Sequence, residues 1–133
     1  MTQQTPNTET RFKRGQRALA QIDGEGGQKV IDALADIAPD FARYLIEFPF
    51  GDIYHRPQLG LREREIATIA ALTAMGTATP QLKVHITAGL NVGLTRIEIV
   101  EILMQMSVYA GFPAAINGLF AAKEVFAAQD LAA

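Results

Sequence analysis

Apolar residues recur every three to four positions along most of the chain, and no stretch alternates convincingly with a period of two. This pattern predicts helices and no sheet. In the first half, we expect helices over residues 10–22 and 28–48, with a corner at Pro39, followed by an irregular stretch over 49–60. In the second half, we expect helices over residues 62–75, 80–91 and 96–110, and a last one that ends near Gln129.

Cap signals support the predicted helices of the second half. Gly76 is placed to end one helix in the left-handed conformation. Thr79 is predicted to be an N-cap residue, with Pro80 at the first helical position. Thr95 and Glu98 have the spacing of a capping box. We therefore predict an all-α fold of about six helices, with a single domain over residues 10–133 after a polar, disordered lead over 1–9.

Two of these helices are more apolar than a small monomer requires. Residues 66–75 are apolar on nearly every face, and between residues 97 and 109 only Glu98, Glu101 and Gln105 form a polar stripe. A helix that is apolar on most faces must be buried on most faces. Contacts between subunits explain this excess best, so we expect a homo-oligomer. The alternative is a monomer with a compact, alanine-rich core.

Composition excludes several classes of protein. The net charge of −2 argues against nucleic-acid binding, which needs a cationic surface. The chain has no cysteine, which removes disulfides, zinc–thiolate sites and all thiol chemistry. The uncharged run over residues 66–82 is shorter than the roughly 20 apolar residues of a membrane span. The polar N-terminus lacks a secretion signal, so we expect a cytoplasmic protein with no membrane partner.

Few residues can carry chemistry, and the two histidines are the first candidates. His55 and His85 are too far apart in the sequence to form a paired metal site, so we expect no bound metal. His85 belongs to a largely apolar helix face, where it is either a hydrogen-bonded core residue or a catalytic one. Glu65 is either a first-turn carboxylate favoured by the helix dipole or an acid inside a pocket.

Two arginines and a tyrosine complete the set of candidates. Arg64 is most simply a solvated charge beside Glu63 and Glu65. Arg56 precedes Pro57 in an irregular segment, where side chains often line sites. Tyr109 stands at a helix break, which is either a plain corner or a place where a hydroxyl reaches the mouth of a pocket.

Five motifs follow one another along the chain: Phe50-Gly51-Asp52-Ile53-Tyr54-His55-Arg56-Pro57-x-Leu59, Arg64-x-x-x-Thr68-Ile69-Ala70, Gln81-Leu82-x-x-His85, Gly93-Leu94-Thr95-x-x-Glu98-Ile99-x-Glu101 and Tyr109-Ala110-Gly111-x-Pro113-Ala114. Together they resemble the carboxymuconolactone decarboxylase superfamily over roughly residues 11–126. The segment around Arg56-Pro57 favours the decarboxylase branch of the superfamily.

The resemblance implies an alkylhydroperoxidase-like helical fold that assembles as a ring, usually a trimer or a hexamer. Its peroxidase members carry a Cys-x-x-Cys pair where this chain has Ala78 and Gln81, so peroxidase chemistry is not available here. The family histidine corresponds to His85, and the carboxylate of the redox branch corresponds to Glu65. Arg56 and Arg64 match positive positions of the decarboxylase branch.

The implied reaction is decarboxylation of 4-carboxymuconolactone, a lactone with two carboxylates, to β-ketoadipate enol-lactone in the catabolism of protocatechuate. Electrons released with carbon dioxide flow to the lactone carbonyl, so no cofactor is expected. In this interpretation His85 delivers a proton or stabilises the enolate, and Glu65 orients His85. Arg56 and Arg64 anchor the substrate carboxylate, with Tyr109 as an additional donor.

Two alternatives remain open at the level of the sequence. The same scaffold could isomerise or hydrolyse another small lactone or enol acid, because a fold does not determine a function. It could also serve as a non-catalytic oligomeric binding protein.

Overall fold

The computed structural model describes residues 9–133, and within this range every regular element is a helix. The elements, in chain order, are α1 (Arg11–Asp23), α2 (Gly26–Leu34), α3 (Pro39–Leu45), the π-helix η1 (Ile46–Ile53), α4 (Leu61–Met75), α5 (Thr79–Asn91), α6 (Arg96–Ala110) and α7 (Phe112–Ala132). The all-α prediction is therefore confirmed. The predicted disordered lead lies, apart from Glu9, outside the described residues.

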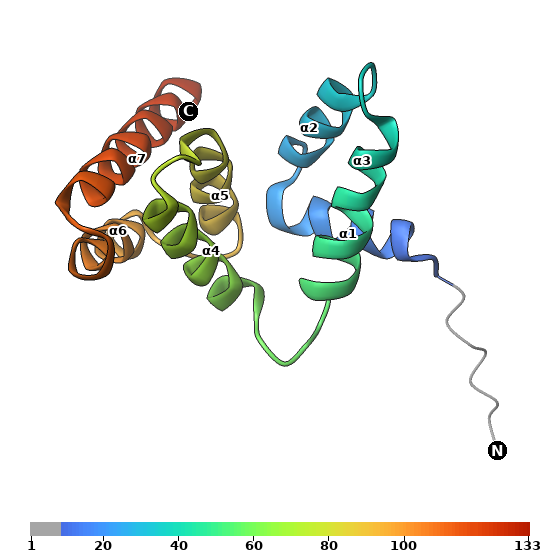
Figure 1. Ribbon diagram of the computed structural model, residues 1–133, viewed down its shortest axis with the longest axis horizontal. Coiled ribbons are helices and arrows are strands. Elements are labelled where there is room, and N and C mark those ends of the chain that lie inside the picture. Colours follow the sequence, from blue (N-terminus) through green and yellow to red (C-terminus); the bar gives the residue numbers. More distant parts are fainter. Residues whose placement is uncertain (1–8) are drawn as a thin grey trace.

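The helices form two groups that meet along α5. Helices α1–α3 lie on one side of the molecule and α4–α7 on the other (Figure 1). Ile69, Ile86 and Leu103 belong to the core of the second group, whereas Leu19, Ile22 and other buried side chains of the first group pack against Ala88 of α5. Because α5 contributes to both cores, its side chains between the groups can line a cavity there.

The ends of the second-half helices follow the predicted caps, with one correction. Gly76 ends α4 with a φ of 73°, and Thr95 and Glu98 form the capping box that starts α6. Thr79, however, is not the N-cap of α5. The first backbone bond of this helix runs from Leu82 N–H to the Ala78 carbonyl, so Ala78 is the N-cap and Thr79 already begins the helix. Pro80 fits there because N–H groups of the first turn need no helical partner.

The first half departs further from the prediction. The glycine-rich turn is shorter than expected, because only Gly24 takes a positive φ and α2 already begins at Gly26. Gly27 packs against Leu19 of α1, where a Cβ atom would lie 2.4 Å from the Leu19 side chain. Close packing of α1 and α2 is thus the reason for this glycine.

The stretch predicted to be irregular, residues 49–60, is helical as far as Ile53. Pro49 has no N–H to offer the carbonyl four residues earlier, which normally ends an α-helix. A π-helix pairs each carbonyl with the N–H five residues later, as Pro49 does with Tyr54 at 2.7 Å. The change from the four-residue to the five-residue spacing leaves one N–H position out of the ladder. The helix therefore continues through Pro49, which has no N–H. Only residues 54–60 form a loop.

Within residues 9–133, no helix is long and apolar enough to cross a membrane.

Candidate active site

A hydrogen bond joins His85 of α5 to Glu65 of α4, twenty positions apart in the sequence. The distance from His85 Nδ1 to Glu65 Oε2 is 2.9 Å. Gly89, one turn after His85, allows the two helices to approach, since a Cβ there would already lie 3.1 Å from Ile69 of α4. Two of the residues predicted from the sequence are therefore in direct contact.

Glu65 lies in the interior of the protein. Its exposed fraction is 0%, and its second oxygen, Oε1, has no hydrogen-bond partner among the described residues. An unpaired buried polar atom costs about 1–3 kcal/mol, so such atoms are rare without a role. Of the two interpretations of Glu65, the first-turn carboxylate does not fit, because the acidic residue in the first turn of α4 is Glu63 and Glu65 is enclosed in the interior.

His85 lines a cavity of about 280 Å³ between the two helix groups. Most of its lining is apolar, and the polar side chains are Asp23, Gln81 and His85. The lining residues are Leu19, Ile22, Asp23, Gly27, Val30, Leu45, Phe50, Pro80, Gln81, Val84, His85 and Ala88. We call this cavity the His85 pocket. Its volume suits a small organic acid, and the histidine uses Nδ1 for Glu65, which leaves Nε2 available to a ligand.

Asp23 is a residue of this pocket that the sequence analysis missed. It is the last residue of α1 and is only 7% exposed. Burial raises the pKa of Asp23, as does the nearby Glu65, whereas His85 and Lys29 act to lower it. A signal was present in the sequence, because a carboxylate in the last turn of a helix faces the negative end of the helix dipole. The burial itself depends on tertiary packing.

The two predicted arginines lie outside the His85 pocket in this protomer. The guanidinium of Arg64 donates to the carbonyl oxygens of Leu59 and Arg56, each at 3.2 Å, and so braces the loop before α4. Arg56 is exposed and lines a different cavity of about 250 Å³ that it shares with His55. Their predicted role as carboxylate anchors stays a prediction.

Tyr109 also lies apart from the His85–Glu65 pair. It is 80% exposed at the end of α6. A different tyrosine, Tyr54, contacts the helix that carries Glu65. Its hydroxyl is hydrogen-bonded to Thr68 of α4 at 2.5 Å. Burial raises the pKa of Tyr54, with Glu65 adding to the effect. Tyr54 therefore stays a neutral hydrogen-bonding group.

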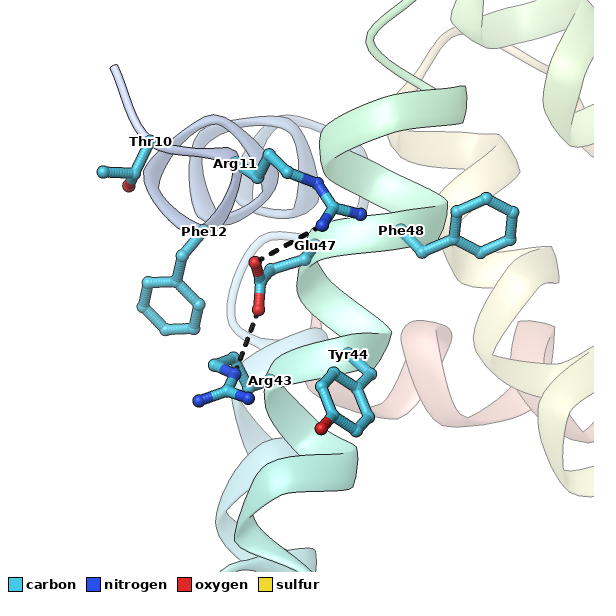
Figure 2. Close-up of a pocket in the computed structure, with 7 residues that line it drawn as sticks. All are labelled: Thr10, Arg11, Phe12, Arg43, Tyr44, Glu47 and Phe48. Atoms are coloured by element: carbon cyan, nitrogen blue, oxygen red, sulfur yellow. Dashed lines mark ion pairs between the residues drawn. The ribbon is translucent and has the colours of Figure 1, made fainter. Parts of the chain in front are cut away.

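A cavity of about 580 Å³, larger than the His85 pocket, lies elsewhere on the surface. Figure 2 shows its lining from α1, α3 and η1, with Glu47 held between Arg11 and Arg43. The Glu47 carboxylate is thus already the ion-pair partner of both arginines. No histidine lines this cavity, so it offers little for acid–base chemistry.

Within residues 9–133, no group of three or more histidine, cysteine, aspartate or glutamate side chains is arranged to hold a metal ion.

Comparison with known proteins places the chain among its relatives. The carboxymuconolactone decarboxylase family matches residues 39–124, which include both Glu65 and His85. The chain belongs to this family. It is 34% identical over 121 residues to a 4-carboxymuconolactone decarboxylase of Acinetobacter baylyi, with 90% of each chain covered. It is 29% identical over 98 residues to a nitrosuccinic acid decarboxylase of Metarhizium robertsii, covering 71% of this chain and 67% of that one.

The match to a family of decarboxylases and the lack of cysteine agree with the resemblance seen in the sequence motifs. The relatives in question are named as decarboxylases, which supports a carboxy-lyase-like enzyme.

Proposed function

We propose that this protein decarboxylates 4-carboxymuconolactone without a cofactor and yields β-ketoadipate enol-lactone. The observation that carries the proposal is the His85–Glu65 pair at the wall of an apolar pocket, in a chain that is 34% identical to a 4-carboxymuconolactone decarboxylase. In this proposal the protein acts in aromatic-acid catabolism, with a small lactone dicarboxylate as its substrate.

The pocket suits the chemistry of this step. The bond between the ring carbon and the departing carboxylate breaks, and its electron pair moves through the ring double bond to the lactone carbonyl oxygen. The apolar lining solvates the departing carboxylate poorly, which favours its loss as neutral carbon dioxide. His85 Nε2 can then meet the developing enolate oxygen, where a positioned polar group is most effective.

The retained carboxylate of the substrate needs a partner as well. No arginine or lysine is among the residues that line the His85 pocket, and Gln81 supplies the only side-chain amide. As carboxylate anchors, Arg56 and Arg64 would therefore act from a neighbouring copy of the chain, in the predicted homo-oligomer. Tyr109, which is strongly exposed, would have to act in the same way.

The relative from Metarhizium robertsii supports a second candidate substrate, nitrosuccinic acid. A nitro group next to the breaking bond can accept the electron pair, as the conjugated lactone carbonyl does. Both substrates thus carry their own electron sink, and the same pocket could serve either.

The experiment is a substrate panel with the purified full-length protein, after treatment with a chelator. Carbon dioxide release and substrate absorbance are both followed for 4-carboxymuconolactone, for nitrosuccinic acid and for other small lactones. The proposal expects the highest kcat/KM for 4-carboxymuconolactone. Faster turnover of nitrosuccinic acid would select the second candidate. Isomerisation or hydrolysis of another lactone, or no turnover by a folded oligomer, would contradict decarboxylation.

A further inference from the structure

The carboxyl group of Asp23 is a buried polar group in the His85 pocket that has no assigned task. It is more than nine-tenths buried. Among the described residues, no hydrogen bond or ion pair engages its side chain, although it lines the same cavity as His85. Its oxygens are not among the fully enclosed, unpartnered atoms, so they keep some accessible surface and are available to a ligand.

Two helix ends act on the carboxyl group of Asp23: the end of α1 disfavours its charged form, whereas the start of α2 at Gly26 favours it. Asp23 ends α1, where the partial charge of the helix end is negative. Its carboxyl lies flat against Gly26, where a Cβ atom would be 2.6 Å from Oδ2 and 2.9 Å from Oδ1. The charged groups around it are His85 of α5, Glu65 of α4 and Lys29 of α2, and burial outweighs them in raising its pKa.

We propose that the carboxyl group of Asp23 is the acid that protonates the substrate carbon, while His85 stabilises the enolate oxygen. The inference rests on the function proposed above. It gives protonation of the carbon to Asp23 and stabilisation of the enolate oxygen to His85, whereas the sequence pointed to His85 for either task. Two polar groups that line one pocket can serve the two ends of the enolate, its oxygen and its α-carbon.

The proton and electron balance closes within the pocket. Loss of carbon dioxide leaves an electron pair on the conjugated enolate. The O–H bond of Asp23 breaks, its proton forms the new C–H bond at the ring carbon α to the carbonyl, and the carbonyl reforms. Asp23 is left as a carboxylate and takes a proton from water at the pocket mouth. One proton is consumed in each turnover, as decarboxylation of a carboxylate requires.

The protonation step can be tested without decarboxylation, because it runs backwards on the product. In D₂O, the protein should catalyse exchange of the ring methylene hydrogens of β-ketoadipate enol-lactone, with Asp23 as the base. The rate is measured by NMR for the wild-type protein, Asp23→Asn and Asp36→Asn. Asp36 is an exposed residue outside the pocket, and its variant is the matched control.

We expect Asp23→Asn to lose about 10²–10⁴ in exchange rate while it still binds the product, and Asp36→Asn to match the wild type. Exchange by Asp23→Asn within threefold of the wild type would overturn the proposal. Should that variant fold poorly, Asp23→Ala with added formate replaces it. Exchange restored by formate supports an acid at this place, whereas a folded, product-binding Asp23→Ala that formate does not rescue contradicts it.

The same experiment separates this inference from the proposed function. If the wild-type protein releases carbon dioxide from the lactone and Asp23→Asn exchanges normally, only the role of Asp23 fails. If the wild-type protein shows neither decarboxylation nor exchange, the proposed function fails and the role of Asp23 fails with it.

Discussion

At the scale of the residue, the site depends on one hydrogen bond between two side chains that differ in burial. Glu65 is fully enclosed, whereas His85 is partly accessible from the pocket. A carboxylate that accepts from Nδ1 fixes the orientation of the imidazole ring and stabilises it when it is charged. We therefore propose that Glu65 is a positioning residue that acts through His85.

Replacement of Glu65 by glutamine tests this positioning. The amide keeps the size of the side chain but removes its negative charge. We expect kcat to fall by about 10–100-fold with little change in KM, by analogy with other groups that orient a functional histidine. Steady-state kinetics on the best substrate of the panel checks this. An unchanged kcat in the folded variant would leave Glu65 with a purely structural role.

The burial of Asp23 predicts a dependence of stability on pH. A carboxyl whose pKa is raised in the folded state destabilises the fold as the pH rises from its unfolded-state pKa, about 3.9, through the folded-state pKa. Asp23→Asn removes this loss. We expect the variant to resist urea better than the wild type at pH 7, with the difference shrinking towards pH 4. A variant that is less stable than the wild type at pH 7 would contradict the raised pKa.

At the scale of the element, the close packing of α1 against η1 holds one wall of the His85 pocket. Gly15 of α1 faces the backbone of Ile46, and Gly51 of η1 faces the carbonyl of Arg11. The two helices approach so closely because both contact points lack a side chain. Leu19 and Phe50, which line the pocket, come from these same two helices.

Gly15→Ala should therefore loosen this wall. The added Cβ would lie 2.1 Å from the Ile46 carbonyl oxygen, so the helices must separate. We expect a loss of about 1–3 kcal/mol in the free energy of unfolding, measured with urea. Gln16→Ala, at the next and exposed position, is the control and should change stability by less than about 0.5 kcal/mol. Equal stabilities of the two variants would disprove the contact.

The accuracy of the sequence prediction varies with how local each signal is. The helices α4 to α6 follow from glycine, proline and capping-box residues that act within one turn, and they were predicted almost to the residue. The π-helix was not, because Pro49 ends most helices and only packing against α1 shows that this one continues. Asp23 was missed for the same reason, since its burial depends on α2 and α5.

At the scale of the whole molecule, the outer surface carries large apolar side chains in helical spacing. Ile97, Met104 and Val108 are exposed on α6, and Phe112, Ile116 and Phe120 on α7. A second series of exposed apolar and aromatic side chains runs from just before α3 along α3 and η1. Its members are Ile37, Phe41, Tyr44 and Phe48. Stripes of this kind on a small protein are typical of subunit contacts and support the predicted homo-oligomer.

A charge placed on such a stripe should disrupt the assembly. Val108 is 73% exposed, so Val108→Lys is compatible with the fold of the protomer. We expect light scattering to give three or six times the 14.4 kDa chain mass for the wild type and a smaller mass for Val108→Lys. Ala20→Lys, exposed on α1, is the control and should keep the wild-type mass. A wild-type protein with the mass of one chain would contradict the homo-oligomer.

We propose that the His85 pocket is the place where a carboxylate is lost as carbon dioxide. The most direct measurement compares carbon dioxide release from 4-carboxymuconolactone by the wild-type protein and by His85→Gln, with circular dichroism to show that both are folded. We expect rapid release by the wild type and a loss of about 10²–10⁴ in turnover for the variant. A folded His85→Gln that retains more than a tenth of the wild-type turnover would contradict it.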